Sequence, residues 1–272
     1  MENERILESI KQSDMILAGL GEDFDIPGFL RQRPEYQRGC EALKEEGSAW
    51  LIPAWNEFCM ERAGDCTDIQ AFERLADLVA DKNYFVISQA VNSRILQAFG
   101  EESADGTHKT GRLVMPCGST VKKQCRAGCK GVLTTVTEED REKLQEMFQK
   151  LTEGRFPDQP FVLTGVCPEC GEPLILNNVY AENYNEEGYL EQWGRYTKWL
   201  QGTLNHRLGI LELGVGMRFP TVIRWPFEKI AFYNEKACFY RVNERLYQLT
   251  KELAEKGCGI AQNAIDWLTQ LC

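Results

Sequence analysis

Two close pairs of cysteines form the clearest chemical pattern in the sequence. Cys125 and Cys129 are followed further along the chain by Cys167 and Cys170. Two short loops that each direct two thiolates at one ion are typical of tetrahedral structural zinc sites. Either pair alone could be ordinary reduced thiols, but both pairs together favour one zinc ion. Because four protein ligands leave no open position for water, we expect this zinc to stabilise the fold without taking part in catalysis.

The composition is that of a globular protein with an acidic surface. The chain has 272 residues, of which 43% are hydrophobic, enough for one large domain and a smaller one. Its 41 acidic and 31 basic residues give a net charge of −10, which disfavours nucleic acids and anionic membranes as partners. Residues 1–5 do not resemble the start of a secretion signal, and no apolar run approaches the ~20 residues of a membrane span. We therefore expect a cytoplasmic protein with largely reduced cysteines.

An apolar segment near the N-terminus predicts a buried strand that ends in a glycine turn. The run from Met15 to Leu20 contains Gly19 and is followed directly by Gly21. Such glycines let backbone N–H groups approach a pyrophosphate at the first turn of a dinucleotide-binding fold. The next residues, Glu22 and Asp23, would repel a pyrophosphate, so a plain turn at the end of a strand is an equally good interpretation.

Three later segments predict strands that also end in glycine or polar residues. Segment 83–92 ends with Ser88, Gln89 and Asn92, segment 208–216 ends with spaced glycines, and segment 236–243 ends with Asn243. Helical patterns separate these segments, including a polar helix over 138–150 that opens with a capping sequence, and another helix over 182–203. The tail, 244–271, alternates helix-like patches around two glycines. This alternation predicts an α/β protein with a Rossmann-like parallel sheet and a small inserted zinc-binding domain.

The serial order of these parts resembles the sirtuins over nearly the whole chain. It is most similar to the macrodomain-associated branch, called class M, because of the two cysteine pairs and the Leu-Glu-Leu-Gly-Val-Gly stretch at 211–216. The resemblance implies a Rossmann-like NAD-binding domain formed by residues 1–110 and 205–272, and a small zinc-ribbon and helical domain formed by residues 111–204. It also implies that NAD meets a protein acceptor, possibly acylated or lipoylated, in the cleft between the two domains.

The resemblance also assigns cofactor-binding residues. It places Gly19 and Gly21 beside the pyrophosphate of NAD, Gly214 and Gly216 beneath the adenosine, and Asn243 at the adenine ribose. These assignments follow from position in the family pattern alone.

Departures from the family pattern concentrate at the predicted nicotinamide pocket. Ser88 and Gln89 match the family's Thr-Gln pair, but Ala90 replaces an Asn that supports the reacting ribose. Asn92 replaces an Asp that holds the carboxamide. Cys117 stands where the family has its catalytic His, and where the macrodomain-linked branch has Gln. With these changes, Gln89, Asn92 and Cys117 are the candidate catalytic residues.

The loss of the imidazole changes the expected chemistry. The chain's histidines, His108 and His206, do not match the catalytic position, and a general base contributes roughly 10²- to 10⁴-fold to a rate. Slow or absent lysine deacylation is therefore expected, with ADP-ribosyl transfer or NAD cleavage less affected. The apolar neighbours of Cys117 should raise the pKa of its thiol, which favours a packing role. The alternatives are a catalytically impaired protein that binds NAD or ADP-ribose, and a zinc-stabilised scaffold without nucleotide.

Overall fold

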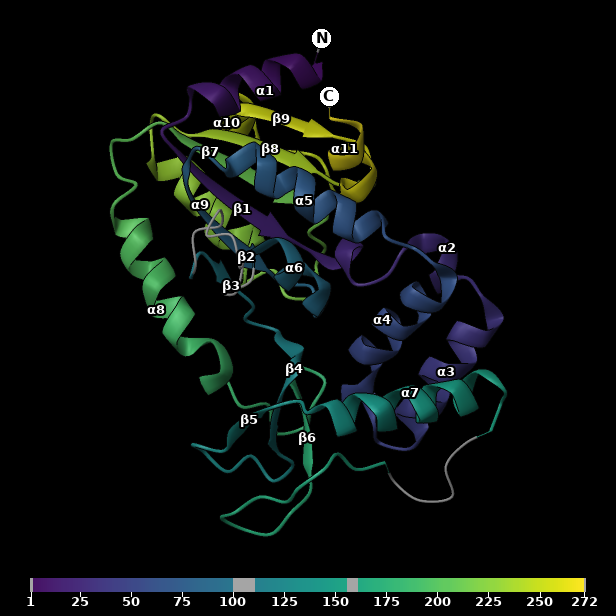
Figure 1. Cartoon of the computed structure of the whole chain (residues 1–272). Coiled ribbons are helices and arrows are strands. Elements are labelled where there is room, and N and C mark those ends of the chain that lie inside the picture. Colours follow the sequence, from purple (N-terminus) through teal and green to yellow (C-terminus); the bar gives the residue numbers. More distant parts are fainter. Residues whose placement is uncertain (1, 100–110, 156–160, 272) are drawn as a thin grey trace.

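A six-stranded parallel sheet forms the larger part of the molecule. The computed structural model describes residues 2–99, 111–155 and 161–271 (Figure 1). Within these residues the strands run in the order β3-β2-β1-β7-β8-β9. Their bounds are β1 Met15–Leu20, β2 Asn83–Ser88, β3 Leu113–Val114, β7 Leu208–Leu213, β8 Cys238–Val242 and β9 Gly257–Ile260.

Strands β2 and β3 lie on one side of β1, and strands β7, β8 and β9 lie on the other side. The strand order therefore reverses between β1 and β7. In the parallel register Leu20 of β1 lies beside Ser88 of β2 and beside Leu213 of β7, so all three strands end at the same level. In parallel α/β sheets, ligands bind outside the carboxyl ends of the strands at such a switch point. The residues that follow these strands, Gly21, Gln89 and Gly214, therefore gather at one edge of the sheet.

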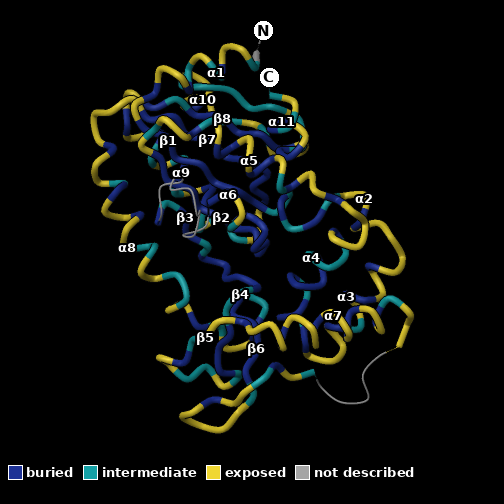
Figure 2. The backbone as a smooth tube through the Cα atoms, in the orientation of Figure 1, coloured by how far each residue is buried: buried dark blue, intermediate teal, exposed yellow. Residues whose placement is uncertain are grey.

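Helices cover both faces of this sheet, because successive side chains of β1 point to opposite sides. Ile16, Ala18 and Leu20 pack beneath the helices of one face, and Met15 and Leu17 pack against those of the other. All six residues of β1 are buried, as the dark blue tube shows (Figure 2). The first face carries α1 Glu2–Gln12, α5 Thr67–Val79 and α11 Ala264–Gln270, and the second carries α8 Glu187–Gln201, α9 Arg224–Tyr233 and α10 Lys251–Ala254.

A smaller antiparallel sheet lies below the first in Figure 1, with helices packed beside it. Trp55 and Phe148 join two of these helices, with ring centroids 5.5 Å apart. The packing thus brings residues 34–63 to the side of the small sheet, whereas the division of the chain at residues 110 and 205 stays a prediction. The elements are β4 Gly118–Cys125, β5 Leu133–Thr135, β6 Leu174–Asn178, α3 Pro34–Glu45, α4 Ile52–Ala63 and α7 Glu138–Thr152.

Short elements complete the connections between the strands and the longer helices. They are η1 Glu22–Phe24, α2 Gly28–Arg31, η2 Ala49–Leu51, η3 Ser93–Ile95 and α6 Leu96–Phe99. The predicted polar helix is confirmed as α7, whose capping box joins Thr137 and Asp140 in both directions. None of the helices that the structure describes is long and apolar enough to cross a membrane.

The predicted α/β architecture is confirmed, but the C-terminal tail holds a strand that the sequence pattern did not indicate. β9 includes Gly257 and Gly259, and glycine is depleted in strands. A Cβ atom at Gly257 would overlap the carbonyl of Phe239, and one at Gly259 would overlap that of Tyr247. The two glycines are therefore needed for close backbone packing at this edge of the sheet.

Candidate functional site

The four cysteines of the two pairs meet at one end of the small sheet. Their sulfur atoms all lie within 4.8 Å of one another, and the Sγ of Cys170 is 3.5 Å from those of Cys125 and Cys129. Zinc–sulfur bonds of ~2.3 Å in a tetrahedron place the sulfurs ~3.8 Å apart, so the cluster fits a structural zinc ion. The fourth ligand, Cys167, accepts at its carbonyl the N–H of Gly171, which closes the second cysteine loop.

The zinc site is remote from the edge where the large sheet ends. Cys125 is the last residue of β4, whereas Gly118, the first residue of that strand, follows directly on Cys117. Seven steps along a strand span roughly 23 Å. The zinc-binding cluster therefore supports the small sheet and does not reach the candidate catalytic residues.

The predicted pyrophosphate glycines are tightly packed. A Cβ atom at Gly19 would lie 2.6 Å from Ile223 and 2.7 Å from Phe227, so this residue faces the core. Gly21 donates its N–H to the carbonyl of Leu213 at 2.8 Å and lies against the backbone of Gly214. The two strand ends at the switch point can approach this closely because neither glycine carries a side chain.

The predicted adenosine glycines face two carboxylates. A Cβ atom at Gly214 would lie 2.5 Å from the Cβ of Asp23, and one at Gly216 would lie 2.5 Å from a carboxylate oxygen of Glu22. Burial raises the pKa of Asp23 to about 6, and its carboxylate accepts the N–H of Ala264 at 3.2 Å. The repulsive pair expected from the sequence thus occupies the space beside these glycines.

Gln89 carries a buried amide that has no hydrogen-bond partner among the residues that the structure describes. Its backbone N–H donates to the carbonyl of Leu20 at 2.7 Å, which aligns the ends of β1 and β2. Its side chain is 3% exposed, and neither the nitrogen nor the oxygen of the amide forms a hydrogen bond. An unsatisfied buried polar group costs about 1–3 kcal/mol, so this amide is a ready partner for a polar ligand. Ser88 donates its hydroxyl to the carbonyl of Ala90 at 3.0 Å, which fixes the turn around Gln89.

Asn92 is already engaged by the protein. Its amide nitrogen donates to the carbonyl of Phe24 and to the carboxylate of Asp68, both at 2.8 Å. Its amide oxygen accepts the N–H of Arg94 at 3.0 Å. Both N–H groups are used, so Asn92 holds the loops after β1 and β2 together, and its catalytic role stays a prediction.

Asn243 likewise shapes the chain around it. Its amide oxygen accepts the N–H groups of Arg245 at 3.0 Å and Leu246 at 2.8 Å, and its nitrogen donates to the carbonyl of Val215 at 3.3 Å. These bonds tie the end of β8 to the end of β7. One amide hydrogen remains for a ligand.

Cys117 lies where the chain passes from β3 of the large sheet to β4 of the small sheet, the region that we call the crevice after the cleft predicted from the sequence. It is 2% exposed, and burial, together with the negative charge of Asp25, raises the pKa of its thiol to about 12. The apolar surroundings predicted from the sequence have the expected effect. A raised pKa favours the protonated thiol at neutral pH, and the catalytic role of Cys117 stays a prediction.

Asp25 is an ionisable group of this crevice that sequence reasoning missed. Its Oδ1 accepts the N–H of Val91 at 2.9 Å, two residues beyond Gln89, and its Oδ2 lies 3.9 Å from a guanidinium nitrogen of Arg218. Burial raises the pKa of Asp25 to about 6, whereas the hydrogen bond from Val91 opposes this shift. A carboxylate with this pKa is suited to take up a proton near neutral pH.

Arg218 connects the two parts of the molecule across the crevice. It follows β7, and its guanidinium lies 5.0 Å from the ring centroid of Tyr180, which follows β6. It also donates to the Tyr180 hydroxyl, and its backbone N–H donates to Glu22 at 3.0 Å. This cation is placed beside Glu22 and Asp25, where it offsets part of their negative charge.

Solved structures of sirtuins share this architecture, although no protein-family model matches the chain. Sir2Tm bound to a propionylated peptide superimposes with a TM-score of 0.56 at 13% identity, covering 100% of this chain and 97% of that chain. Sir2 bound to acetylated peptide gives 0.55 at 12% identity, with coverages of 100% and 97%. A complex of a Sir2 homolog with NAD gives 0.50 at 14% identity, with coverages of 98% and 91%.

The chain has the sirtuin fold. A curated relative, "Protein ADP-ribosyltransferase" of Staphylococcus aureus (strain Mu50 / ATCC 700699), is 22% identical over 202 residues. The match covers 74% of this chain and 59% of the relative's length. Because much of that relative remains uncovered, its activity comes to this chain only as a proposal.

Within this sirtuin fold, Glu57 of α4 fixes the two sides of the crevice relative to each other. Its carboxylate accepts the N–H of Ser93 at 2.7 Å and the hydroxyl of Thr120 at 3.0 Å. Ser93 follows Asn92, and Thr120 is near the start of β4, so one carboxylate joins the loop after β2 to the segment that follows Cys117. This arrangement supports the crevice without occupying it.

The sirtuin fold therefore brings together some predicted residues and separates others. Val91, two residues beyond Gln89, donates its N–H to Asp25, and the charge of Asp25 acts on the thiol of Cys117. The side-chain amides of Asn92 and Asn243 form most of their hydrogen bonds with other groups of the protein. His206 lies in the chain just before β7, and His108 falls outside the described residues. The signal that would have found Asp25 is an acidic residue shortly after a glycine turn at the carboxyl end of β1.

Proposed function

We propose that this chain is a sirtuin-family enzyme of the macrodomain-associated type that cleaves NAD and transfers ADP-ribose to a protein acceptor. The observation that carries the proposal is the buried amide of Gln89 at the switch point of the sheet, which has no hydrogen-bond partner among the described residues. The name of the Staphylococcus aureus relative and the NAD complex of a structural neighbour support it. Lysine deacylation is weak or absent in this proposal.

NAD is the substrate that the crevice would hold. The Gln89 amide offers a donor and an acceptor to the ribose hydroxyls or the carboxamide at the nicotinamide end. The other binding positions that we propose are Gly21, Ser88, Gly214, Gly216 and Asn243, whereas Gly19 packs against the core. Asp23, with a pKa of about 6, and Glu22, which accepts the Arg218 N–H, would lie close to the pyrophosphate. We expect the negative charge of Asp23 to weaken affinity for NAD as the pH rises through about 6.

The proposed transfer needs one proton acceptor, and Asp25 is suited to that role. The bond between the ribose C1′ and nicotinamide breaks, and its electron pair leaves with the nicotinamide. A lone pair of the acceptor forms the new bond to C1′, and the acceptor's proton moves to the Asp25 carboxylate. With a pKa of about 6, Asp25 is mostly ionised at pH 7 and can accept it.

Deacylation is disfavoured because the position that supplies the family's base holds Cys117. In the family pattern that base takes a proton from a ribose hydroxyl. The Cys117 thiol, with a pKa of about 12, remains protonated and cannot accept one. The protein acceptor would enter between the two sheets, where Arg218 and Tyr180 now contact each other.

The reaction class is tested by offering acyl-lysine peptides and labelled NAD side by side. We expect nicotinamide release and label transfer, with little deacylation. Asp25→Asn should lower nicotinamide release by about 10²- to 10⁴-fold, the usual contribution of a general base. Asp81→Asn, a change at an exposed carboxylate outside the crevice, should leave the rate unchanged. Rapid deacylation by the wild type, or full activity of Asp25→Asn, would contradict the proposed mechanism.

A further inference from the structure

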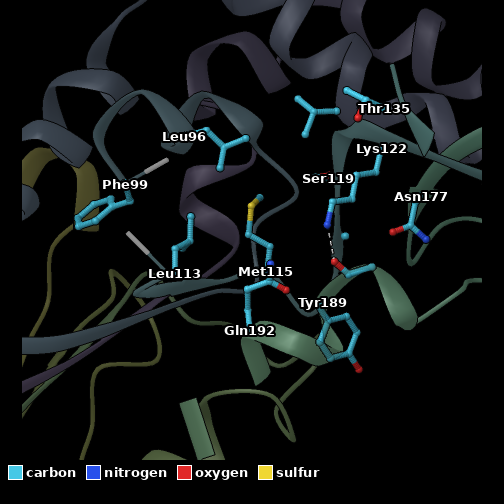
Figure 3. Close-up of a pocket in the computed structure, with 14 residues that line it drawn as sticks. Leu96, Phe99, Leu113, Met115, Ser119, Lys122, Thr135, Asn177, Tyr189 and Gln192 are labelled. Carbon is cyan, nitrogen blue, oxygen red and sulfur yellow. Dashed lines mark hydrogen bonds between the residues drawn. The ribbon is translucent and has the colours of Figure 1, made fainter. Parts of the chain in front are cut away.

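A hollow lies beside the segment that carries Cys117. It has a volume of about 530 Å³ and is bounded by α6, β3, β4 and α8 (Figure 3). Met115, Gly118 and Ser119, which flank Cys117 in the chain, belong to its wall. Small-molecule sites usually measure about 300–1,000 Å³, so the hollow has the size of a ligand pocket.

The pocket has an apolar end and a polar end. Leu96, Phe99, Leu113 and Met115 cluster on one side of the close-up, and Lys122 lies with Ser119 and Asn177 on the other (Figure 3). Asn177 donates its amide nitrogen to Gln124 and to the carbonyl of Asn185, so this side chain is held by the protein. Lys122 is the charged side chain among the described residues of the pocket wall, and it is therefore the polar group best suited to bind a ligand.

Lys122 differs sharply from its neighbour Lys123. Lys123 is buried on the other face of β4, where its ammonium lies 2.5 Å from the carboxylate of Asp140. The ammonium of Lys122 donates to the carbonyl of Gly188 at 2.6 Å, and no carboxylate of the described residues lies within ion-pair distance of it. Two of its three N–H donors remain beside an apolar wall. In a chain of net charge −10, a cation that forms no ion pair within the described part of the chain favours an anionic ligand.

We propose that this pocket binds a small amphipathic carboxylic acid. Its carboxylate pairs with the Lys122 ammonium, and its apolar body packs against Leu113, Met115 and the side chains beyond them. Charge complementarity sets the orientation, because the opposite orientation would bury a carboxylate among apolar groups without a partner. This site is separate from the crevice of the proposed NAD chemistry, and its occupancy does not depend on that chemistry.

The site is tested with three probes of one shape, 4-phenylbutyrate, 4-phenylbutanol and 4-phenylbutylamine, by calorimetric titration of the full chain. The acid should bind saturably, and the alcohol and the amine at least about tenfold more weakly. Lys122→Met should weaken the acid by about tenfold or more, and Lys122→Arg should retain most of the affinity. Lys130→Met, which removes an exposed lysine of the same domain, should have no effect.

Thermal unfolding of each variant shows that a loss of binding is not a loss of folding. A second variant, Met115→Gln, keeps the side-chain length but makes the apolar end polar, and it should also weaken the acid. The proposal is overturned if 4-phenylbutyrate does not bind the folded protein at millimolar concentration, if the alcohol binds as tightly as the acid, or if Lys122→Met binds the acid like the wild type.

Discussion

Asp25 is the residue on which the proposed chemistry depends, and its environment makes its ionised form unfavourable. Burial raises its pKa from the usual 3.8 to about 6, so folding favours the protonated carboxyl. The folded state then binds more protons than the unfolded state between about pH 4 and pH 6. Stability therefore falls as the pH rises through this window, and the full penalty is present above it.

A substitution that removes this charge should stabilise the protein while it removes activity. We expect Asp25→Asn to raise the free energy of unfolding at pH 7 by up to about 3 kcal/mol, the equivalent of a pKa raised from 3.8 to about 6. The amide oxygen can still accept the Val91 N–H. Denaturant unfolding at pH 7 and near pH 4 provides the measurement, since the gain should shrink at the lower pH. A destabilised Asp25→Asn at pH 7 would show that the carboxylate supports the fold.

The same pKa sets the expected pH dependence of the reaction. If Asp25 accepts the acceptor's proton, nicotinamide release should fall as the pH drops through about 6, because the carboxyl is then protonated before the reaction begins. A pH–rate profile from pH 5 to 8 under saturating NAD measures this. A rate that stays level down to pH 5 would assign the base to another group or to none.

Site properties that depend on neighbouring residues in the sequence were predictable, whereas roles that depend on contacts between distant segments were not. The four cysteines of the zinc site and the raised pKa of Cys117 could be predicted, because ligand spacing and apolar neighbours are local in the sequence. Asp25 and Arg218 were missed, because their roles depend on contacts between segments far apart in the chain. The occupied amide of Asn92 depends on Asp68, which no local pattern relates to it.

At the scale of elements, the zinc cluster is the principal support of the outer part of the small sheet. The core at this end consists of Val132, Leu174 and the cysteines themselves, which is too little to hold the loops alone. We expect about one zinc per chain, lost on Cys167→Ser. Chelation should open β4–β6 before the six-stranded sheet, because metal binding there contributes folding energy.

Metal analysis and hydrogen exchange check this prediction together. Cys66→Ser, at an exposed cysteine outside the cluster, is the matched control and should leave the zinc content unchanged. Well-folded protein without zinc, or simultaneous opening of both sheets on chelation, would contradict the assignment.

The strands were predictable where their sequence is continuous and apolar. β1, β2, β7 and β8 each occur within a segment that the hydrophobic pattern indicated, because strands buried on both faces consist of such runs. β9 was not predicted, because its glycines are needed for close contact with neighbouring backbone and hydrophobic periodicity does not show such a need. Helical patterns between the strand segments were predicted, but not the packing of α3 and α4 against α7.

At the scale of the whole molecule, a small number of side chains can be named that join the large sheet to the small one. Arg218 stacks on Tyr180 from one side, and Glu57 joins Ser93 to Thr120 on the other. These contacts hold the sides in place while leaving the Gln89 amide without a hydrogen bond to the described part of the chain. The sirtuin fold thus positions a polar group that no other described residue satisfies and that a bound polar molecule would satisfy.

Calorimetric titration of NAD against the wild type and Gln89→Leu tests the central claim most directly. Leucine fills similar space without an orphaned amide, so the unliganded variant should be at least as stable as the wild type. The wild type should bind NAD, and its stability should rise by about 2.7 kcal/mol at a hundredfold excess over Kd. Gln89→Leu should bind at least about tenfold more weakly, and the exposed control Gln37→Leu should bind normally. Equal binding by Gln89→Leu, or no binding by the wild type at millimolar NAD, would contradict the account.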